Sequence, residues 1–245
     1  MKWSVALFFA GLFGALGTVF ILLSFGTDYW LLARETCKTD SQLLDIVEHG
    51  DLMVNQAADD GNSSTFYHEG FFWRCSFGGR GDEDIILKFW FTNQPHSKVC
   101  IHAYLFPFPV SEQTHNATTY ESAIIYRGFW SIFVLLGVTA VILGGFIIIC
   151  AAPFTNSCLY KAGGGLFLTA GFFILLATVL SVIWLELMDM VDLYEEYQKH
   201  HLCPDFQLNI TYGLSFMFAP VGVFFCLLSG LLFLLIGQAA KRHYY

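Results

Sequence analysis

The amino-acid sequence predicts an all-α membrane protein: a four-helix bundle with a small, disulfide-stapled antiparallel β-sheet in its first extracellular loop. The first observation is composition, since 56% of the 245 residues are hydrophobic and only 13% are charged, about half the charged share of a soluble domain. The second is that apolar residues gather in four long runs. The third is that the charges lie in the connections between these runs. This apolar content excludes a disordered chain.

Four segments are long and apolar enough to be membrane-spanning helices, which need about 20 apolar residues. A spanning strand of a β-barrel would alternate in polarity instead. The first segment could be a cleaved signal peptide, but its apolar stretch from Val5 to Phe25 exceeds the roughly 7–15 residues of a signal core. We therefore interpret it as a retained anchor and residues 1–245 as one domain. The predicted spans are residues 3–27, 128–152, 162–185 and 212–237.

The distribution of charge orients these spans. The two termini (238–245 at the C-terminal side) and the middle loop 153–161 share four basic residues and no acid, namely Lys2, Lys161, Lys241 and Arg242. All twenty acids and the other eight bases lie in the connections 28–127 and 186–211, which carry −12 together. Because basic loops stay in the cytosol, we predict a multi-pass plasma-membrane protein with both termini cytosolic. The net charge of −8 argues against nucleic acid as a partner.

Aromatic residues mark the ends of the predicted spans. Trp3 opens the first span, Trp30 follows its end, Trp130 opens the second, Trp184 lies near the end of the third and Tyr212 opens the fourth. Amphipathic rings favour the depth of the lipid headgroups. We therefore expect these side chains to form interfacial belts.

The first extracellular loop, 28–127, contains strand signals. Four short runs are rich in aromatic or aliphatic residues and bounded by Gly, Asn or Pro, which is typical of strands. They are Tyr29–Ala33, Phe71–Phe77, Ile85–Phe91 and Val99–Leu105. Ser41–Glu48 reads as a short helical or disordered insert, and Thr119–Arg127 leads into the second span. A small antiparallel sheet that rests on the helix ends fits this pattern.

The same connections hold candidate modification sites. Three glycosylation sequons begin at Asn62, Asn116 and Asn209. Asn62 lies in the loop Ala57–Thr65 and is the best candidate, whereas Asn209 lies within three residues of the fourth span.

The seven cysteines divide by compartment. Cys37, Cys75, Cys100 and Cys203 lie outside, where disulfides persist. Four cysteines allow three pairings, and the sequence alone leaves these open. We expect the remaining three, Cys150, Cys158 and Cys226, to stay reduced.

Catalytic and metal-binding patterns are missing from the sequence. It has no nucleophile motif, phosphate loop or CxxC pair, and the adjacent His200 and His201 would point apart. The span interiors carry no charge, whereas pumps, channels and embedded enzymes bury polar groups there. We therefore predict a protein that is not an enzyme, with no cofactor, metal or small-molecule substrate. Its function would lie in the outer loops and in lateral contact with another membrane protein.

Small residues recur every four positions in two of the spans. Ala6, Ala10 and Gly14 form one series, and Gly222, Cys226 and Gly230 form the other. This spacing lets helix backbones approach closely. We favour packing within the chain over dimerisation.

One set of residues resembles the claudin-like superfamily, which includes claudins, epithelial and peripheral myelin membrane proteins and auxiliary subunits of glutamate-receptor channels. Trp30 matches the first Trp of the family pattern, Cys100 matches its second cysteine, and the middle element is matched by Gly70, Phe71, Phe72, Trp73, Arg74 and Cys75. Phe72 stands where the motif Trp would be, and the interval from Cys75 to Cys100 is longer than in claudins. The resemblance implies the claudin-like fold, and these departures argue against barrier function.

The resemblance also suggests a disulfide pairing. The two family cysteines correspond to Cys75 and Cys100, which we expect to join adjacent strands. Cys37 and Cys203 are then the remaining pair, which would link the first outer loop to the second.

A longer resemblance, to a muscle-associated member of this superfamily, extends over almost the whole chain. The stretch Ser41–Ser64 is longer than expected for that member. The matching segments are Tyr67–Cys75, Lys88–Pro95, Tyr126–Trp130, Cys150–Phe154 and Tyr160–Gly165. The resemblance implies a negative regulator of myogenesis, myoblast fusion and muscle regeneration. Its implied partner is integrin β1, whose engagement of laminin it would weaken.

Other classes of function make different predictions. A claudin-type junction protein would form rows at cell contacts, and many such proteins end in a PDZ-binding tail. The tail Lys241–Tyr245 ends in an aromatic residue but lacks the Ser or Thr two positions earlier. An auxiliary subunit of an ion channel or receptor would alter the gating of a co-expressed channel. An enzyme embedded in the bilayer conflicts with the charge-free spans.

Overall fold

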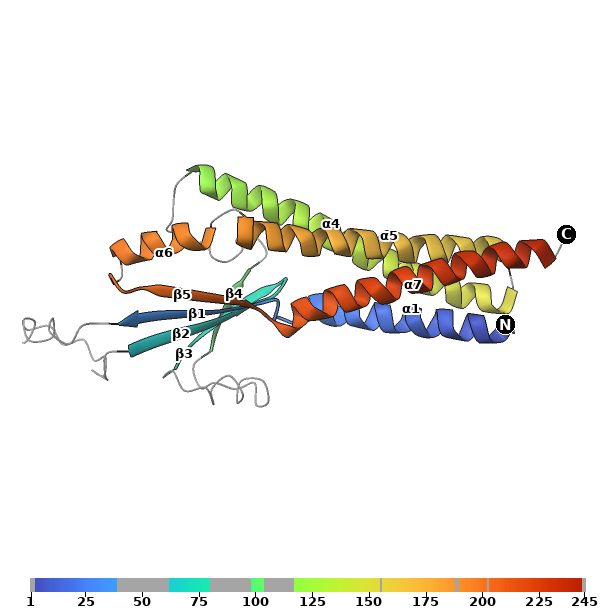
Figure 1. The fold of residues 1–245 in the computed structure, drawn as a ribbon, viewed down its shortest axis with the longest axis horizontal. Coiled ribbons are helices and arrows are strands. Elements are labelled where there is room, and N and C mark those ends of the chain that lie inside the picture. The colour runs from blue at the N-terminus through green and yellow to red at the C-terminus, as the bar shows by residue number, and fades with distance from the viewer. Residues whose placement is uncertain are drawn as a thin grey trace, which may run out of the picture.

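The computed structural model describes residues 3–38, 62–79, 98–103, 117–154, 156–187, 190–201 and 203–243. Four long helices lie side by side at one end of the molecule, and a β-sheet with a short helix lies at the other (Figure 1). Both termini lie at the helical end (Figure 1). We call the two ends the sheet end and the terminal end.

The four long helices are α1 (Trp3–Gly26), α4 (Ala117–Phe154), α5 (Ser157–Val182) and α7 (Leu214–His243). Each includes a segment long and apolar enough to cross a membrane, which confirms the prediction of four apolar helices. After α5 the chain makes one π-helical segment, η1 (Ile183–Leu187).

Two helix boundaries differ from the predicted spans. The helix α4 begins at Ala117, so the stretch 119–127 that was predicted to lead into the second span is itself helical. The helix α7 begins at Leu214, and Tyr212 belongs to a strand instead. Neither boundary could be predicted from hydropathy, because hydropathy identifies the length of an apolar run and not the residue at which a helix begins.

Small residues bring α1, α5 and α7 into close contact. A Cβ atom on Gly17 would lie 2.7 Å from the Cys226 sulfur, and one on Gly164 would lie 2.8 Å from the Gly230 carbonyl oxygen. The Ser229 hydroxyl donates to the Ala10 carbonyl at 2.9 Å. The small residues that recur every four positions therefore pack helices within the chain.

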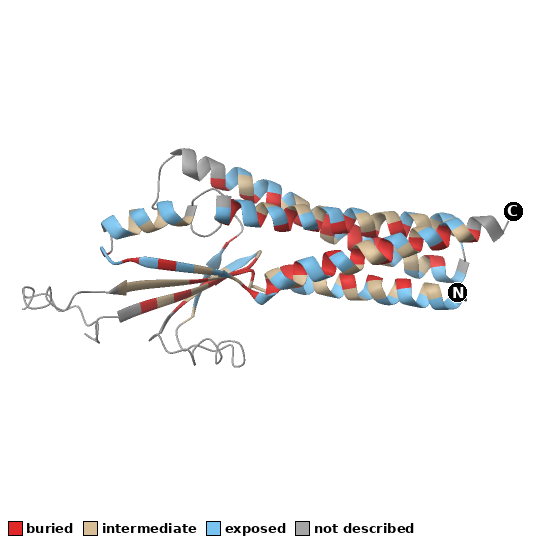
Figure 2. Ribbon diagram, viewed as in Figure 1, coloured by how far each residue is buried: buried red, intermediate tan, exposed pale blue. Residues whose placement is uncertain are grey.

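The outer surface of the bundle is apolar. Many residues of the four helices are exposed (Figure 2), and large hydrophobic residues of all four are among them. Exposed apolar area on this scale is typical of a surface that contacts lipid or another membrane protein. The most exposed side chains include Phe8, Phe146, Ile149, Phe224 and Leu235.

Five antiparallel strands form the sheet. They are β1 (Leu31–Lys38), β2 (Asn62–Glu69), β3 (Trp73–Gly79), β4 (Val99–His102) and β5 (Gln207–Tyr212). Their order across the sheet is β4-β3-β2-β1-β5. Four strands come from the first connection between spans and one from the second, so the sheet joins two distant parts of the chain.

The strand predictions need two corrections. The sheet is not confined to the first loop, because β5 pairs with β1 from residue 207 to residue 212. In addition, β2 begins at Asn62, within the stretch 57–65 that was interpreted as a loop. The predicted strand 85–91 and the insert 41–48 lie outside the described residues.

A further helix, α6 (Met190–His201), covers one face of the sheet next to β1 and β5 (Figure 1). A small core forms between them from Ala33, Cys203, Phe206 and Leu208. Because side chains alternate along a strand, only one face of β5 contributes to this core.

The predicted aromatic belt is wrong for Trp30, Trp130 and Trp184. Trp30, Trp130 and Trp184 are only 5%, 1% and 3% exposed. Trp30 contacts Trp130 with ring centroids 5.7 Å apart, and Trp184 stacks on Tyr126 at 4.4 Å. These rings fill the junction between the helices and the sheet, where large flat side chains bury the most area.

Candidate functional site

The family motif forms the turn between β2 and β3, against the end of α1. A Cβ atom on Gly70 would lie 2.5 Å from the Asp28 Cα and 3.0 Å from the Thr27 carbonyl oxygen, so only glycine fits. The Trp30 N–H donates to the Glu69 carbonyl at 2.9 Å, and the Gly70 N–H donates to the Trp73 carbonyl at 2.9 Å. The motif therefore fixes how the sheet leaves the first helix.

A buried guanidinium ties this turn to α4. Arg127 donates to the carbonyls of Gly70 at 3.3 Å and Phe71 at 3.1 Å, and its Nη1 lies 4.0 Å from Glu69. Its guanidinium also lies 4.4 Å from the ring centre of Trp130. Arg127 was not among the predicted site residues, although the sequence offers one signal, a basic residue directly ahead of an apolar run.

The exposed part of the motif is aromatic. Phe72 is 52% and Trp73 40% exposed, whereas Phe71 stacks on Trp130 at 5.3 Å. Trp73 stacks on His102 of the neighbouring strand at 4.3 Å. Arg74 turns inward and donates to Glu69 at 2.7 Å. The motif thus divides into a buried anchor and a small aromatic surface.

His68 lies buried beside the motif and stacks on Tyr29 at 4.8 Å. Its Nδ1 lies 2.6 Å from the Asp28 carbonyl oxygen. Desolvation by burial lowers the pKa of His68 to about 4. The imidazole is therefore neutral at physiological pH.

The four cysteines that were assigned outside form two disulfides. Cys75–Cys100 joins β3 to β4 at directly opposed positions. Cys37–Cys203 joins the end of β1 to the turn that precedes β5. This is the pairing suggested by the resemblance.

A partly buried carboxylate links β1, β2 and α6. Glu35 accepts hydrogen bonds from the hydroxyls of Tyr67 at 2.9 Å and Tyr194 at 2.8 Å. Burial raises the pKa of Glu35, and burial next to this carboxylate also raises the pKa of both tyrosines. Glu35 was not predicted as a site residue, because its two partners come from distant segments of the chain.

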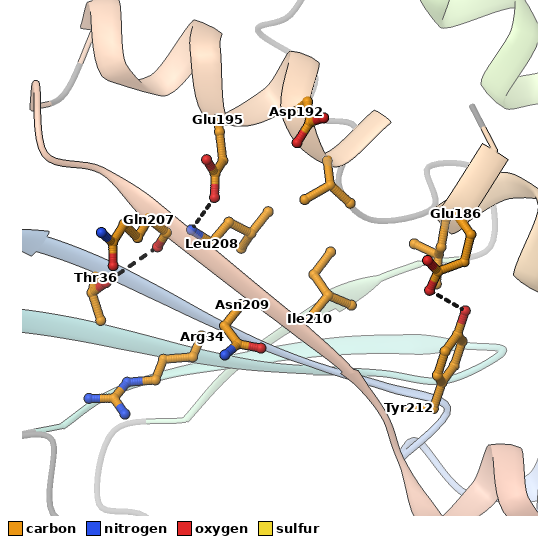
Figure 3. Close-up of a pocket in the computed structure, with 12 residues that line it drawn as sticks. Arg34, Thr36, Glu186, Asp192, Glu195, Gln207, Leu208, Asn209, Ile210 and Tyr212 are labelled. Carbon is orange, nitrogen blue, oxygen red and sulfur yellow. Dashed lines mark hydrogen bonds between the residues drawn. The ribbon is translucent and has the colours of Figure 1, made fainter. Parts of the chain in front are cut away.

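A groove with a volume of about 820 Å³ runs along the edge of β5 (Figure 3). Glu195 of α6 accepts from the Leu208 N–H at 2.8 Å, and the Tyr212 hydroxyl donates to Glu186 at 3.2 Å. These two bonds hold α6 and η1 beside the strand. The lining residues are Arg34, Thr36, Leu185, Glu186, Val191, Asp192, Glu195, Gln207, Leu208, Asn209, Ile210 and Tyr212.

The groove is acidic. Three carboxylates and one guanidinium are among its lining residues. Within the described part of the chain, no cluster of three or more His, Cys, Asp or Glu side chains is arranged to hold a metal ion. The groove is therefore suited to a basic ligand that carries its own hydrogen-bonding groups.

The predicted sequons lie in different settings. Asn62 is the first residue of β2. Asn209 is exposed in β5 and lines the groove. Asn116 lies outside the described residues. The strand around Asn209 was not predicted, although Gln207–Tyr212 alternates polar and apolar residues as a half-buried strand does.

Comparison with known proteins agrees with this architecture. The family model described as PMP-22/EMP/MP20/Claudin tight junction matches residues 15–235. Transmembrane protein 182 from Danio rerio is 60% identical over 247 residues, which covers 100% of both chains. The human protein of that name is 46% identical with the same coverage, and the Gallus gallus protein is 49% identical over 98% of this chain and 97% of its own. The chain therefore belongs to the PMP-22/EMP/MP20/claudin family of multi-pass membrane proteins.

Proposed function

We propose that this protein is a non-enzymatic regulator that binds integrin β1 in the membrane and thereby restrains myogenesis, myoblast fusion and muscle regeneration. The observation that carries the proposal is identity of 46–60% over the full length to transmembrane protein 182 from fish and mammals, the muscle-associated member that the sequence resembles. The family is not known for enzymes.

The architecture supports a binding role. The sheet is fixed to the bundle by the buried Arg127 and by the aromatic junction around Trp130, so it is a preorganised surface and not a flexible loop. Preorganised surfaces lose less conformational entropy on binding. The exposed rings of Phe72 and Trp73 and the β5 groove are two candidate contact regions on it.

The proposal places the sheet end outside the cell. In the sequence, the two termini and the loop 153–161 carry four basic residues and no acid, and basic segments next to spans stay in the cytosol. If the sheet end faces the secretory lumen, the parent protein from muscle cells should run faster on a gel after treatment with glycosidase. An Asn62→Gln variant should lack one glycan and should therefore run faster than the parent before treatment. Labelling of a C-terminal tag on unpermeabilised cells would contradict this orientation.

The direct test is capture of integrin β1 with the tagged full-length protein from muscle-cell membranes. We expect capture that survives mild detergent, together with weaker adhesion of the cells to laminin. A matched control exchanges residues 62–79 and 98–103 for those of a claudin and keeps the four helices. Equal capture by this chimera would place the contact in the helices, and no capture by the parent protein would refute the proposal.

A junction role is the second candidate, because the matched family description includes the tight junction. It predicts that the tagged protein concentrates in continuous rows where two expressing cells touch. Auxiliary-subunit function remains testable by recording the gating of co-expressed receptor channels. Uniform surface distribution with unaltered gating would leave integrin binding as the surviving proposal.

A further inference from the structure

The edge strand β5 has one side that is not used by the sheet. On the side of β1, the Gly213 N–H donates to the carbonyl of Trp30, the residue before β1, at 3.0 Å. On the side away from β1, the Leu208 N–H donates to Glu195 of α6. Hydrogen-bonding groups alternate along an antiparallel strand. The backbone groups of Leu208, Ile210 and Tyr212 therefore face away from β1.

These outward groups face the β5 groove. Leu208, Ile210 and Tyr212 all line it, opposite residues of α6 and η1 (Figure 3). Glu195 accepts from the first outward N–H, that of Leu208, and no described residue outside the sheet accepts from the N–H of Ile210. An open strand edge pairs readily with an extended chain, and a volume of about 820 Å³ lies in the usual range of ligand sites.

The charge around the groove selects the chemistry of the occupant. Glu186, Asp192 and Glu195 line the groove, and the guanidinium of Arg34 is held 5.2 Å from the ring centre of Phe66. A basic segment would complement these carboxylates. A second copy of this chain fits poorly, because the two connections that form its sheet end carry twenty acids and eight bases.

We propose that the β5 groove binds an extended basic segment of a partner protein, which adds to the sheet as a sixth strand beside β5. Main-chain hydrogen bonds to Ile210 and Tyr212 would supply affinity, and contacts to Glu186 and Asp192 would select basic side chains, as in other cases of strand addition. The inference relies on the proposed function only for the identity of the partner.

The first test uses the full-length protein in phosphatidylcholine nanodiscs and a fluorescent hexapeptide of alternating lysine and valine. We expect saturable binding that weakens with salt. A glutamate–valine hexapeptide should bind at least about tenfold more weakly, since it carries the charge of the groove. A lysine–valine peptide with alternate amides methylated should fail to bind, because it cannot donate to a strand edge. Equal binding of all three peptides would overturn the proposal.

Variants of the groove locate the binding. Ile210→Pro removes an outward N–H and leaves the bonds to β1, as proline does at sheet edges, so the lysine–valine peptide should bind about tenfold more weakly. Ile210→Val is the matched control and should bind like the parent. The double change Glu186→Gln and Asp192→Asn keeps size and should weaken binding about fivefold and flatten its salt dependence. Parent-like binding by both the proline and the double variant would overturn the proposal.

Capture of integrin β1 separates this inference from the proposed function. If the parent protein and Ile210→Val capture the integrin and Ile210→Pro does not, both stand. If all three capture it equally and the three peptides also bind alike, the inference is overturned and the proposed function survives. If peptide binding follows the expected pattern and the parent captures no integrin, the proposed function is overturned and the groove remains a site for another basic partner.

Discussion

Replacement of Arg127 by methionine is the sharpest test of how the sheet is held on the bundle. The side chain of Arg127 is 6% exposed and makes two hydrogen bonds to backbone carbonyls of the motif turn. Methionine fills a similar volume and donates no hydrogen bond. The change therefore removes the polar contacts and keeps much of the packing.

The magnitude follows from the contacts that are lost. Breaking a buried charged pair costs about 3–5 kcal/mol, because carbonyls and a carboxylate lose their donor. Glu69 keeps Arg74 as a partner at 2.7 Å, so the loss should lie near the lower limit. We expect Arg127→Met to lower the free energy of unfolding by about 3 kcal/mol. Arg127→Lys keeps the charge but loses the planar, forked arrangement of N–H donors. Its free energy of unfolding should lie between those of the parent and Arg127→Met.

The assay is unfolding of the full-length protein in mixed micelles by titration with SDS. The matched control is Lys199→Met, since Lys199 forms an exposed pair with Glu195 at 3.1 Å, worth at most about 1 kcal/mol. A loss for Arg127→Met no larger than that of Lys199→Met would refute the account. The sheet would then be held on the bundle by its disulfides and aromatic packing alone.

Three further changes test other parts of the fold. Gly70→Ala forces a Cβ atom against backbone and should cost about 1–3 kcal/mol in the same titration, whereas Gly128→Ala meets nothing within 4 Å and should be neutral. The pKa of His68 is lowered to about 4, so the unfolded chain binds a proton at higher pH than the folded protein does. The free energy of unfolding should therefore decline as the pH falls from about 6.5 to 4. The same decline in a His68→Gln variant would contradict this. Paired replacement of Cys37 and Cys203 by serine should cost about 2–5 kcal/mol and leave the four helices intact by circular dichroism.

The four spans could be predicted because each depends on local composition. A run such as Val5–Phe25 is apolar over enough length to cross a bilayer whatever the rest of the chain does. The orientation of the spans stays a prediction, made from a similarly simple count of charges. Boundaries were harder, since the polar stretch 119–127 continues a helix beyond the lipid-soluble run.

The sheet and its site depended on contacts between distant residues. Tyr212 was assigned to a span because an aromatic residue next to an apolar run suits both a strand and a helix start, and its pairing with Leu31 decides between them. Trp130 fits an interfacial belt as well as a buried junction by composition alone. The β5 groove could not be foreseen, because it forms only when α6 and β5 meet.

The position of β5 also sets an order for biosynthesis. The strand β1 is complete at residue 38, but its neighbour on one side is not synthesised until residue 212. Synthesis proceeds at about 5–20 residues per second. The edge of β1 that later pairs with β5 therefore stays unpaired for roughly 10–40 s, while two more helices enter the membrane. During that interval a chaperone on the sheet side of the membrane would have an open strand to bind. Substitutions that weaken β5 should therefore reduce the yield of folded protein before they affect any activity of the molecules that do fold.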